Sequence, residues 1–479
     1  MLPVVVVGGG ISGLATAWRL SQTLPRRDVV VLEQRPRTGG LLRRELLPPG
    51  LTVPQAMSVD TGAESLLARR PEALDLIAEI GLGPDLVHPR TSRAGVLSRG
   101  VVHPMPAGTL MGVPSSPGAL AGVLTANEVR RVAAEPTDPR PVRADDVSVG
   151  AWVGERLGRA VVDRLVEPLL GGVYAGHADR LSLRSCIPAL WPAAKEGTSL
   201  LQAAAAAVAA QPGHGTAAGA ATPVFAGLRG GVARLAEALR ERLVGEGVQV
   251  RTGACAQGLR RTEAGWDVLL GPRLDDGRAV REVLPAAAVV LAVPAPATSR
   301  LLADVAPPAA RLLRGVTTAS VAVVTVAVDA GPLADIDLSG LLVPPVEGRL
   351  IKAVTLSSTK WDWVARRAPG LALVRMSVGR AGEEASLHRS DDDLAQAALD
   401  DLCQILDRDL VRRSTLVTRW GGSLPQYDVG HHAVAAEVLA EVGAIGGLAC
   451  AGSTYLGVGV PACLLSADQA AEAVRGYLG

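Results

Sequence analysis

The chain has 479 residues, of which 48% are hydrophobic and 20% charged, and its formal net charge is +1. This balance is typical of a globular protein, and the near-zero net charge gives no electrostatic reason to expect a nucleic-acid partner. The length exceeds that of one ordinary core, so we expect two or three substructures.

A strand–helix–strand unit is predicted at the beginning of the chain. Residues 4–7 are consecutive valines, which is typical of a buried parallel strand, and apolar residues at helical spacing follow over 11–24. Residues 28–33 predict the second strand. A unit of this length forms half of a dinucleotide-binding fold. Residues 70–82 then predict an amphipathic helix that stops at a glycine.

The character of the sequence changes in the next hundred residues. Residues 103–117 are rich in proline and glycine and predict loops. Residues 148–176 predict helices, with Ser148 as the N-terminal cap. Residues 211–223 are the best candidate for a mobile loop.

Helix and strand patterns return in the second half. Residues 225–250 predict a helix and then a strand, and 286–298 predict a buried strand that ends at a proline. Residues 319–329 and 371–380 predict strands of a second sheet, with a loop over 357–363 between them. The end of the chain predicts a strand, a glycine-rich turn and a final helix.

These elements predict an α/β protein whose chain leaves one layer and returns to it. We expect a Rossmann-like dinucleotide-binding domain made of separated segments, with a mixed-sheet substrate domain and a helical region inserted between them. The expected boundaries are 1–75, 223–300 and 416–479 for the dinucleotide-binding segments, 76–222 for the mainly helical insertion with substrate-side loops, and 301–415 for the substrate-domain sheet.

Membrane-spanning segments, metal sites and disulfides are not predicted. Apolar runs such as residues 319–328 are shorter than the roughly 18–20 residues of a spanning helix, which leaves peripheral membrane contact at most. The five cysteines lack metal-binding spacing, so we expect reduced thiols, no metal and a cytoplasmic location. His177, His431 and His432 are interpreted as surface or loop histidines.

The turn between the first strand and helix carries G-x-G-x-x-G at Gly8, Gly10 and Gly13. The first glycine permits the tight turn, the second lets the backbone approach a pyrophosphate, and the third lets helix and strand pack closely. The pyrophosphate would lie at the helix N-terminus, where unpaired N–H groups favour an anion. Glu33 ends the next strand, where an acid accepts hydrogen bonds from ribose hydroxyls.

Further features narrow the choice of dinucleotide. The acid at Glu33 argues against the 2′-phosphate of NADP and leaves NAD and FAD. Gly39 and Gly40 form a second glycine pair, and residues 452–461 (GSTYLGVGVP) form a late glycine turn into a helix. The set resembles the FAD-dependent amine and porphyrinogen oxidases, whose second FAD signature is R-x-G-G. In that family the dipole of the late helix stabilises negative charge on the reduced flavin.

Four longer stretches narrow the resemblance. Residues 103–114 (HPMPAGTLMGVP), 166–185 (VEPLLGGVYAGHADRLSLRS), 417–431 and 457–463 are similar to protoporphyrinogen and coproporphyrinogen oxidases, above all the soluble forms of Gram-positive bacteria. The similarity extends from residue 4 to the final helix. It implies an FAD-binding fold of the amine-oxidase and p-hydroxybenzoate-hydroxylase type.

The resemblance also implies which residues contact FAD. This chain carries Ala462 where relatives usually have an acid, so no local role of that acid is expected, whereas the backbone contacts are unaffected. The implied contacts are Gly8, Gly9, Gly10, Ile11, Ser12, Gly13, Glu33, Gly39, Gly40, Thr61, Gly62, Ala63, Glu64, Ala256, Trp420, Gly457, Val458, Gly459 and Val460.

The reaction implied by the resemblance is oxidation of a porphyrinogen by oxygen in haem biosynthesis. The flavin accepts hydride at N5 and molecular oxygen reoxidises it, with release of hydrogen peroxide. No catalytic acid or base stands out in the sequence, and the substrate's pyrrole nitrogens are our hypothesis for proton transfer. A ferrochelatase would receive the product.

The substrate is a flat apolar ring with carboxylates, which needs an apolar slot and cations at its rim. Arg70 lies where relatives carry a basic residue, and Lys195, Lys352 and Lys360 are lower-ranked candidates. Tyr174 is a candidate for stacking beside the ring, with core packing as the alternative.

Coproporphyrinogen III is favoured as the substrate because the chain resembles the soluble Gram-positive forms. Protoporphyrinogen IX is the alternative physiological substrate and is expected to be oxidised as well. A flavin amine oxidase is a rival, for which Trp420 and Tyr455 are the plausible aromatic cage. A non-enzymatic binding protein on the same fold, without a working flavin site, is the other rival.

Overall fold

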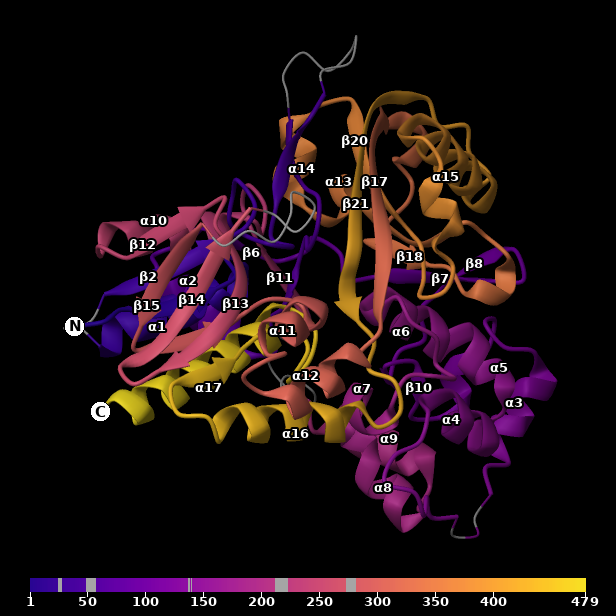
Figure 1. Ribbon diagram of the computed structural model, residues 1–479. Coiled ribbons are helices and arrows are strands. Elements are labelled where there is room, and N and C mark those ends of the chain that lie inside the picture. Colours follow the sequence, from indigo (N-terminus) through magenta and orange to yellow (C-terminus); the bar gives the residue numbers. More distant parts are fainter. Residues whose placement is uncertain (25–27, 49–56, 137, 139, 212–222, 273–280) are drawn as a thin grey trace.

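The computed structural model describes residues 1–24, 28–48, 57–136, 138, 140–211, 223–272 and 281–479. Figure 1 shows three regions: a layered α/β region that holds both chain termini, a tall twisted sheet beside it, and a group of short helices below that sheet. The candidate site described below lies where parts of all three regions meet.

The α/β region is built on a five-stranded parallel sheet with the order β12-β2-β1-β16-β22. Its strands come from separated parts of the chain, which confirms the predicted discontinuous fold. They are β1 (Val4–Val7), β2 (Val29–Glu33), β12 (Gln249–Thr252), β16 (Ala288–Leu291) and β22 (Leu448–Cys450).

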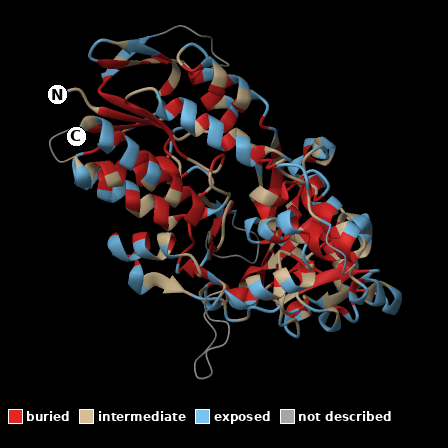
Figure 2. Ribbon diagram, turned by 90° about the horizontal axis from the view of Figure 1, so that it is seen from below, coloured by how far each residue is buried: buried red, intermediate tan, exposed pale blue. Residues whose placement is uncertain are grey.

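Elements on both faces of this sheet explain the run of valines. Val4 and Val6 pack against helices, whereas Val5 and Val7 pack into a second core, so every residue of β1 is buried. Figure 2 shows these strands as a buried layer. The first face is covered by α1 (Ile11–Thr23), α2 (Pro71–Glu79), α10 (Arg234–Gly245) and α17 (Val460–Leu478). The second is covered by β13 (Cys255–Thr262), β14 (Gly265–Gly271), β15 (Glu282–Ala286), α11 (Ala295–Leu301), α12 (Pro307–Arg314) and α16 (His431–Gly443).

The tall sheet has seven strands in the order β21-β17-β20-β19-β18-β7-β8. Only the β18–β7 pair is parallel, so the sheet is mixed, as expected. Helix α15 (Asp391–Leu406) packs on one face and forms an apolar core with it. The strands are β7 (Ala94–Ser98), β8 (Val101–Pro104), β17 (Thr318–Asp329), β18 (Gly340–Leu342), β19 (Ile351–Leu356), β20 (Leu371–Val378) and β21 (Arg412–Pro425).

The helical region has its own core, centred on residues such as Trp152, Leu165 and Tyr427. The side chain of Ser148 accepts a hydrogen bond from the N–H of Ala151 at 3.2 Å, which confirms the predicted cap. The helices are α3 (Ala126–Ala133), α4 (Val149–Leu157), α5 (Arg159–Val161), α6 (Glu167–Tyr174), α7 (Leu183–Cys186), α8 (Trp191–Glu196) and α9 (Leu200–Ala209).

Three small strand groups connect the regions. The hairpin of β3 (Arg44–Leu47) and β4 (Met57–Asp60) leads from the first segment toward the tall sheet. Strands β5 (Leu66–Leu67), β6 (Leu86–Val87) and β11 (Phe225–Leu228) form the second group, and β9 (Thr109–Leu110) and β10 (Val113–Pro114) the third.

The loop-rich stretch predicted over 103–117 is interrupted by short strands, and the loop predicted over 357–363 is wrong. Residues 103–117 contain the end of β8 and both β9 and β10, and β7 with β8 extends the tall sheet from within the expected helical insertion. The cause is pairing of β7 with the distant β18, which local composition does not encode. Residues 357–363 hold α13 (Ser357–Lys360) and the start of α14 (Asp362–Arg367), stabilised by burial of Trp361.

The remaining expectations concern loops and membranes. The loop expected over 211–223 lies, except for its two end residues, outside the described residues. No helix in the described part of the chain has the length and apolar character needed to cross a membrane.

Candidate functional site

The first glycine turn is held by contacts that tolerate no side chain. A Cβ at Gly13 would overlap the carbonyl oxygen of Gly8, and one at Gly8 would overlap that of Ala292. Gly8 also has φ +114°, which L side chains rarely adopt. Helix α1 therefore begins directly against the end of β1, with its N-terminus pointing past the turn.

Glu33 closes one side of this turn. Its Oε2 accepts a 2.9 Å hydrogen bond from the N–H of Gly9, and its Oε1 accepts one of 2.8 Å from the N–H of Arg35. Residues leading into β13 are tied to the same place, because the N–H of Ala254 donates to the carbonyl of Glu33 at 3.0 Å. Ala256 thus lies just beyond the strand end that carries the acid.

The second glycine pair lies against the first. The N–H of Gly39 donates to the carbonyl of Gly9 at 2.8 Å, and a Cβ at Gly10 would meet only the Cα of Gly40, at 3.9 Å. Gly40 itself has φ +59°. The two loops thus present a bare backbone surface of the kind that lets a flat or extended ligand approach closely.

A second helix N-terminus converges on the same place. Helix α17 packs against α1, and burial in this contact raises the pKa of the Cys463 thiol in α17 to about 11. Neither helix has a side-chain cap or an acidic residue in its first turn. Gly459 precedes α17 with φ +100°, and no atom lies within 4 Å of where its Cβ would be. Both helix ends are therefore available to negative charge.

Segment 61–64 is held by donors from the tall sheet. The indole Nε1 of Trp420 donates to the carbonyl of Thr61 at 2.8 Å, and the guanidinium of Arg375 donates to the carbonyl of Gly62 at 2.6 Å. The side chain of Glu64 leaves this segment and accepts from Arg375 at 2.7 Å. Any ligand contact from Glu64 would therefore come from its backbone.

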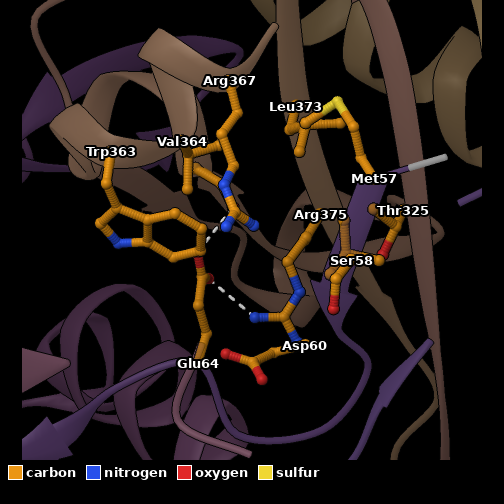
Figure 3. Close-up of a pocket in the computed structure, with 12 residues that line it drawn as sticks. Met57, Ser58, Asp60, Glu64, Thr325, Trp363, Val364, Arg367, Leu373 and Arg375 are labelled. Atoms are coloured by element: carbon orange, nitrogen blue, oxygen red, sulfur yellow. Dashed lines mark hydrogen bonds and ion pairs between the residues drawn. The ribbon is translucent and has the colours of Figure 1, made fainter. Parts of the chain in front are cut away.

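The Glu64–Arg375 ion pair borders a small cavity of about 20 Å³ between β4, β17, β20 and α14 (Figure 3). Arg375 holds the pKa of Glu64 below its usual range against the opposing effect of burial. Thr325 Oγ1, Trp363 Nε1 and Arg375 Nε are buried there without a hydrogen-bond partner among the described residues. Because such a volume suits about one water, we expect an ordered water rather than a large ligand here.

A broader apolar surface lies on the face of the tall sheet opposite α15. Leu342, Ala353, Ser377 and Val323 are register partners on β18, β19, β20 and β17, and each is only half-buried. We call these four residues the half-exposed row. The exposed Gly172 lies against one end of the row, since its Cβ would be 3.5 Å from Leu342.

The other end of the half-exposed row meets the glycine loops. Val323 and Leu41, which directly follows Gly40, both pack against the apolar cluster that contains Trp420. A flat apolar molecule on the row would therefore lie between the end of α6 and the loops described above. An apolar surface of this kind, with exposed backbone groups at one end, is typical of a small-molecule site.

Comparison with known proteins agrees with this geometry. The family described as flavin containing amine oxidoreductase matches residues 11–475. The chain belongs to this family. It is 38% identical over 476 residues to "Coproporphyrinogen III oxidase" of Mycobacterium tuberculosis H37Rv, which covers 98% of this chain and 96% of the relative.

Two further relatives span the chain. "Protoporphyrinogen oxidase" of Bos taurus is 31% identical and covers 99% of this chain and 98% of its own. A solved chain from Exiguobacterium sp. 255-15 superposes with a TM-score of 0.82 at 31% identity, covering 99% of this chain and 98% of that one. The predicted family, FAD-binding fold and oxidoreductase class are thereby confirmed.

The residues of the site fit the FAD of this flavoenzyme family. The uncapped N-terminus of α1 suits the pyrophosphate, Glu33 suits the ribose, and the bare surface at Gly10 and Gly40 leaves room for the cofactor's backbone contacts. The open N-terminus of α17 suits the flavin ring. Bound there, FAD would supply the hydride acceptor.

The candidate substrate residues lie in different parts of the structure. Arg70 lies at the start of α2, paired with Glu72. Lys195 is exposed on α8 over the ring of Trp191, and Figure 1 places α8 at the far end of the helical region, a position that does not favour the expected substrate contact. Lys352 is buried beside the half-exposed row.

For Tyr174 the structure favours the alternative expectation, core packing. Its ring is buried and packs on Tyr427 at a centroid distance of 5.4 Å. His431 is buried as well, stacked on Tyr427 at 4.0 Å, and so is not a surface histidine. Both side chains belong to the contact between the helical region and α16, which only the tertiary structure creates.

Metal and amine-oxidase interpretations find no support in the described residues. No cluster of His, Cys, Asp and Glu there could hold a metal ion. Trp420 and Tyr455 pack in different apolar clusters, so they do not form the aromatic cage that an amine oxidase would need.

Proposed function

We propose that this chain is a coproporphyrinogen III oxidase that uses FAD and molecular oxygen. Each cycle would remove two electrons and two protons from the porphyrinogen and pass them to oxygen as hydrogen peroxide; three cycles yield coproporphyrin III. The observation that carries the proposal is the full-length identity of 38% to a coproporphyrinogen III oxidase, together with an apolar face that ends at the expected flavin site.

The protein's own part in this reaction is to hold the ring. The half-exposed row would support one face of the macrocycle, and its small side chains, Ala353 and Ser377, suit close approach of a flat molecule. Trp420 and Leu41 connect the row to the glycine loops, so one methylene bridge would face the N-terminus of α17. No titratable side chain belongs to the row, which supports proton transfer through the substrate's own nitrogens.

Protoporphyrinogen IX oxidation is the second candidate. The bovine relative, a protoporphyrinogen oxidase at 31% identity over nearly the whole chain, favours it. Both substrates share the apolar ring and differ in the number of carboxylates, so we expect both to be oxidised. A ferrochelatase is the proposed acceptor of the product, because a planar porphyrin is the substrate of metal insertion.

Turnover with both porphyrinogens side by side tests the proposal. The purified FAD-loaded protein is mixed with each in air, and porphyrin fluorescence and peroxide are followed together. We expect a higher kcat/KM for coproporphyrinogen III and one peroxide for each electron pair removed. A higher value for protoporphyrinogen would make that the physiological substrate.

Two further outcomes would reject the proposal altogether. Turnover of a primary amine without any porphyrinogen turnover would make the chain an amine oxidase. A colourless protein that takes up no FAD would make it a binding protein on the same fold.

A further inference from the structure

Two buried cations lie side by side next to the half-exposed row. Lys352 and Arg380 have exposed fractions of only 4% and 5%. The ammonium of Lys352 donates to the carbonyl of Gly379 at 2.7 Å, and the guanidinium of Arg380 donates to the carbonyl of Val343 at 3.0 Å. Each of the two side chains thus donates a hydrogen bond to a neutral backbone oxygen, which does not neutralise its charge.

The carboxylates nearby do not balance this charge. Glu383 reaches Arg380 only at 3.5 Å, is half exposed, and also faces His177 at 3.6 Å. Glu167 accepts from the N–H of Ala178 at 2.6 Å and pairs with the ring of His177 at 2.9 Å. Among the described residues, Lys352 has no carboxylate within ion-pair distance, and Arg380 has only the long contact to the exposed Glu383 and the electrostatic effect of Glu167. Burying two adjacent cations in this way is costly unless another anion joins them.

Burial, with Arg380 as a second cause, lowers the pKa of Lys352 to about 7. Burial likewise lowers the pKa of Arg380. A carboxylate placed between them would act in the opposite direction on both groups. The electrostatics of the pair therefore suit a ligand anion.

The pair borders the surface assigned to the substrate. Lys352 is the extra residue of a bulge in β19 and immediately precedes Ala353 of the half-exposed row. Arg380 precedes Ala381, which packs against the same apolar cluster as Val323 of the half-exposed row. Helix α6 closes this corner by packing against β18 and β19 (Figure 1), and a Cβ at Gly171 would lie 3.9 Å from Arg380 Nε.

A ligand carboxylate would reach the pair from the row. A cavity of about 210 Å³ near Glu167 is lined by three acids, Asp163, Glu167 and Asp179, together with Arg159 and His177. These acids would repel a carboxylate, whereas the row is apolar and would carry the ring that bears it. Glycines at the end of α6 leave space for a flexible acid chain.

We propose that Lys352 and Arg380 form the binding site for a carboxylate side chain of the tetrapyrrole substrate. This inference rests on the proposed function and adds to it the group that anchors one edge of the ring. Lys352 would leave the Gly379 carbonyl and Arg380 would keep its bond to Val343, so the carboxylate would receive donors from both. The role is binding, with no part in the redox chemistry.

The test compares an acid ligand with its neutral ester. Binding of coproporphyrin III and of coproporphyrin III tetramethyl ester to the FAD-loaded protein is measured by fluorescence quenching, for wild type, Lys352→Met and Lys352→Arg. Arg311→Met, which removes one exposed cation on α12, is the control for net charge. Flavin content and Tm are recorded for each variant, and Lys352→Gln replaces Lys352→Met if the latter does not fold.

The proposal expects Lys352→Met to raise the Kd of the acid about 10-fold or more, in line with a hydrogen bond between charged groups. The ester should change less than about twofold, Lys352→Arg should recover most of the affinity, and the control should match wild type. Equal losses for acid and ester would show a structural role and overturn the proposal, as would no loss for either.

The failure of the proposed function would look different. Wild-type protein that oxidises no coproporphyrinogen would reject the proposed reaction, whereas acid-over-ester preference is measured without turnover. With the reaction intact, Lys352→Met should raise KM for coproporphyrinogen III about 10-fold and change kcat less than about threefold. An unchanged KM would count against carboxylate binding by Lys352 and Arg380.

Discussion

The indole Nε1 of Trp420 donates a 2.8 Å hydrogen bond to the carbonyl of Thr61, 359 residues earlier in the chain. One partner belongs to the tall sheet and the other to the segment expected to contact FAD. The bond is buried, and the guanidinium of Arg43 lies over the indole at 5.7 Å. The sheet that would hold the substrate thus also positions a cofactor-binding segment.

Replacing Trp420 with Phe should therefore weaken FAD binding. The variant keeps an aromatic ring but leaves the Thr61 carbonyl buried without its donor, which costs about 1–3 kcal/mol. We expect the Kd of FAD to rise about 10-fold, measured by flavin fluorescence during reconstitution of the apoprotein. Trp191→Phe, in the helical region, is the matched control and should leave the Kd unchanged. Equal Kd values for both variants would contradict this role.

Gly13→Ala should destabilise the first glycine turn. Its new Cβ would overlap the Gly8 carbonyl oxygen, and backbone atoms cannot move aside as a side chain can. We expect a loss near the upper end of the usual overpacking range of about 1–3 kcal/mol, together with loss of bound flavin. Gly245→Ala, at the end of α10 with open space around it, is the control and should not be destabilised. Denaturant unfolding with flavin absorbance measures both.

The Glu64–Arg375 pair should be costly to break on one side only (Figure 3). Arg375→Met removes the ion-pair partner of the buried Glu64 carboxylate and leaves it only the Lys360 charge and the donors Ser357 and Trp361. Breaking a buried pair on one side typically costs about 3–5 kcal/mol, and the variant also removes the donor to Gly62. The double variant Glu64→Gln/Arg375→Met should recover part of that loss because the Glu64 carboxylate is no longer buried without the guanidinium. Free energies of unfolding from urea titrations provide the comparison. Additive losses would mean that the two charges do not interact.

Two histidines should give opposite pH dependence of stability. Burial lowers the pKa of His431, whose Nε2 lies 2.8 Å from the carbonyl oxygen of Thr454. The hydrogen bond to Glu167 raises the pKa of His177. With an unfolded pKa of about 6.5, the stabilisation from neutral His431 is present above that pH and is lost as the pH falls through its lowered folded pKa. The stabilisation from protonated His177 is present below pH 6.5 and is lost as the pH rises through its raised folded pKa.

Urea midpoints between pH 5 and 8 test this pair of signs. His431→Gln should reduce the loss of stability on acidification, whereas His177→Gln should increase it. Each variant serves as the control for the other, because both remove one imidazole from the same contact region near α6 and α16. If both variants changed the pH dependence of the urea midpoint in the same direction, the lowered pKa of His431 and the raised pKa of His177 could not both be correct.

Local sequence patterns were sufficient for the first sheet and for the expected cofactor site. Four adjacent valines indicated a strand buried on both faces, and β1 packs against a separate core on each side. Gly8, Gly13 and Glu33 indicated a dinucleotide turn because that motif depends on backbone conformation and close approach within one short unit. The spacing of such a motif does not depend on how the rest of the chain packs.

Only the tertiary structure distinguished between the candidate residues for the substrate side. Lys195 and Lys352 were equivalent in sequence, yet one is exposed on α8 and the other is buried beside Arg380, because burial depends on which distant elements pack together. The half-exposed row unites four strands, and β7 joins the same sheet from 246 residues before its partner in the pair Ala94–Gly340. Such non-local pairing follows from the global packing of apolar surface, which no short stretch of sequence encodes.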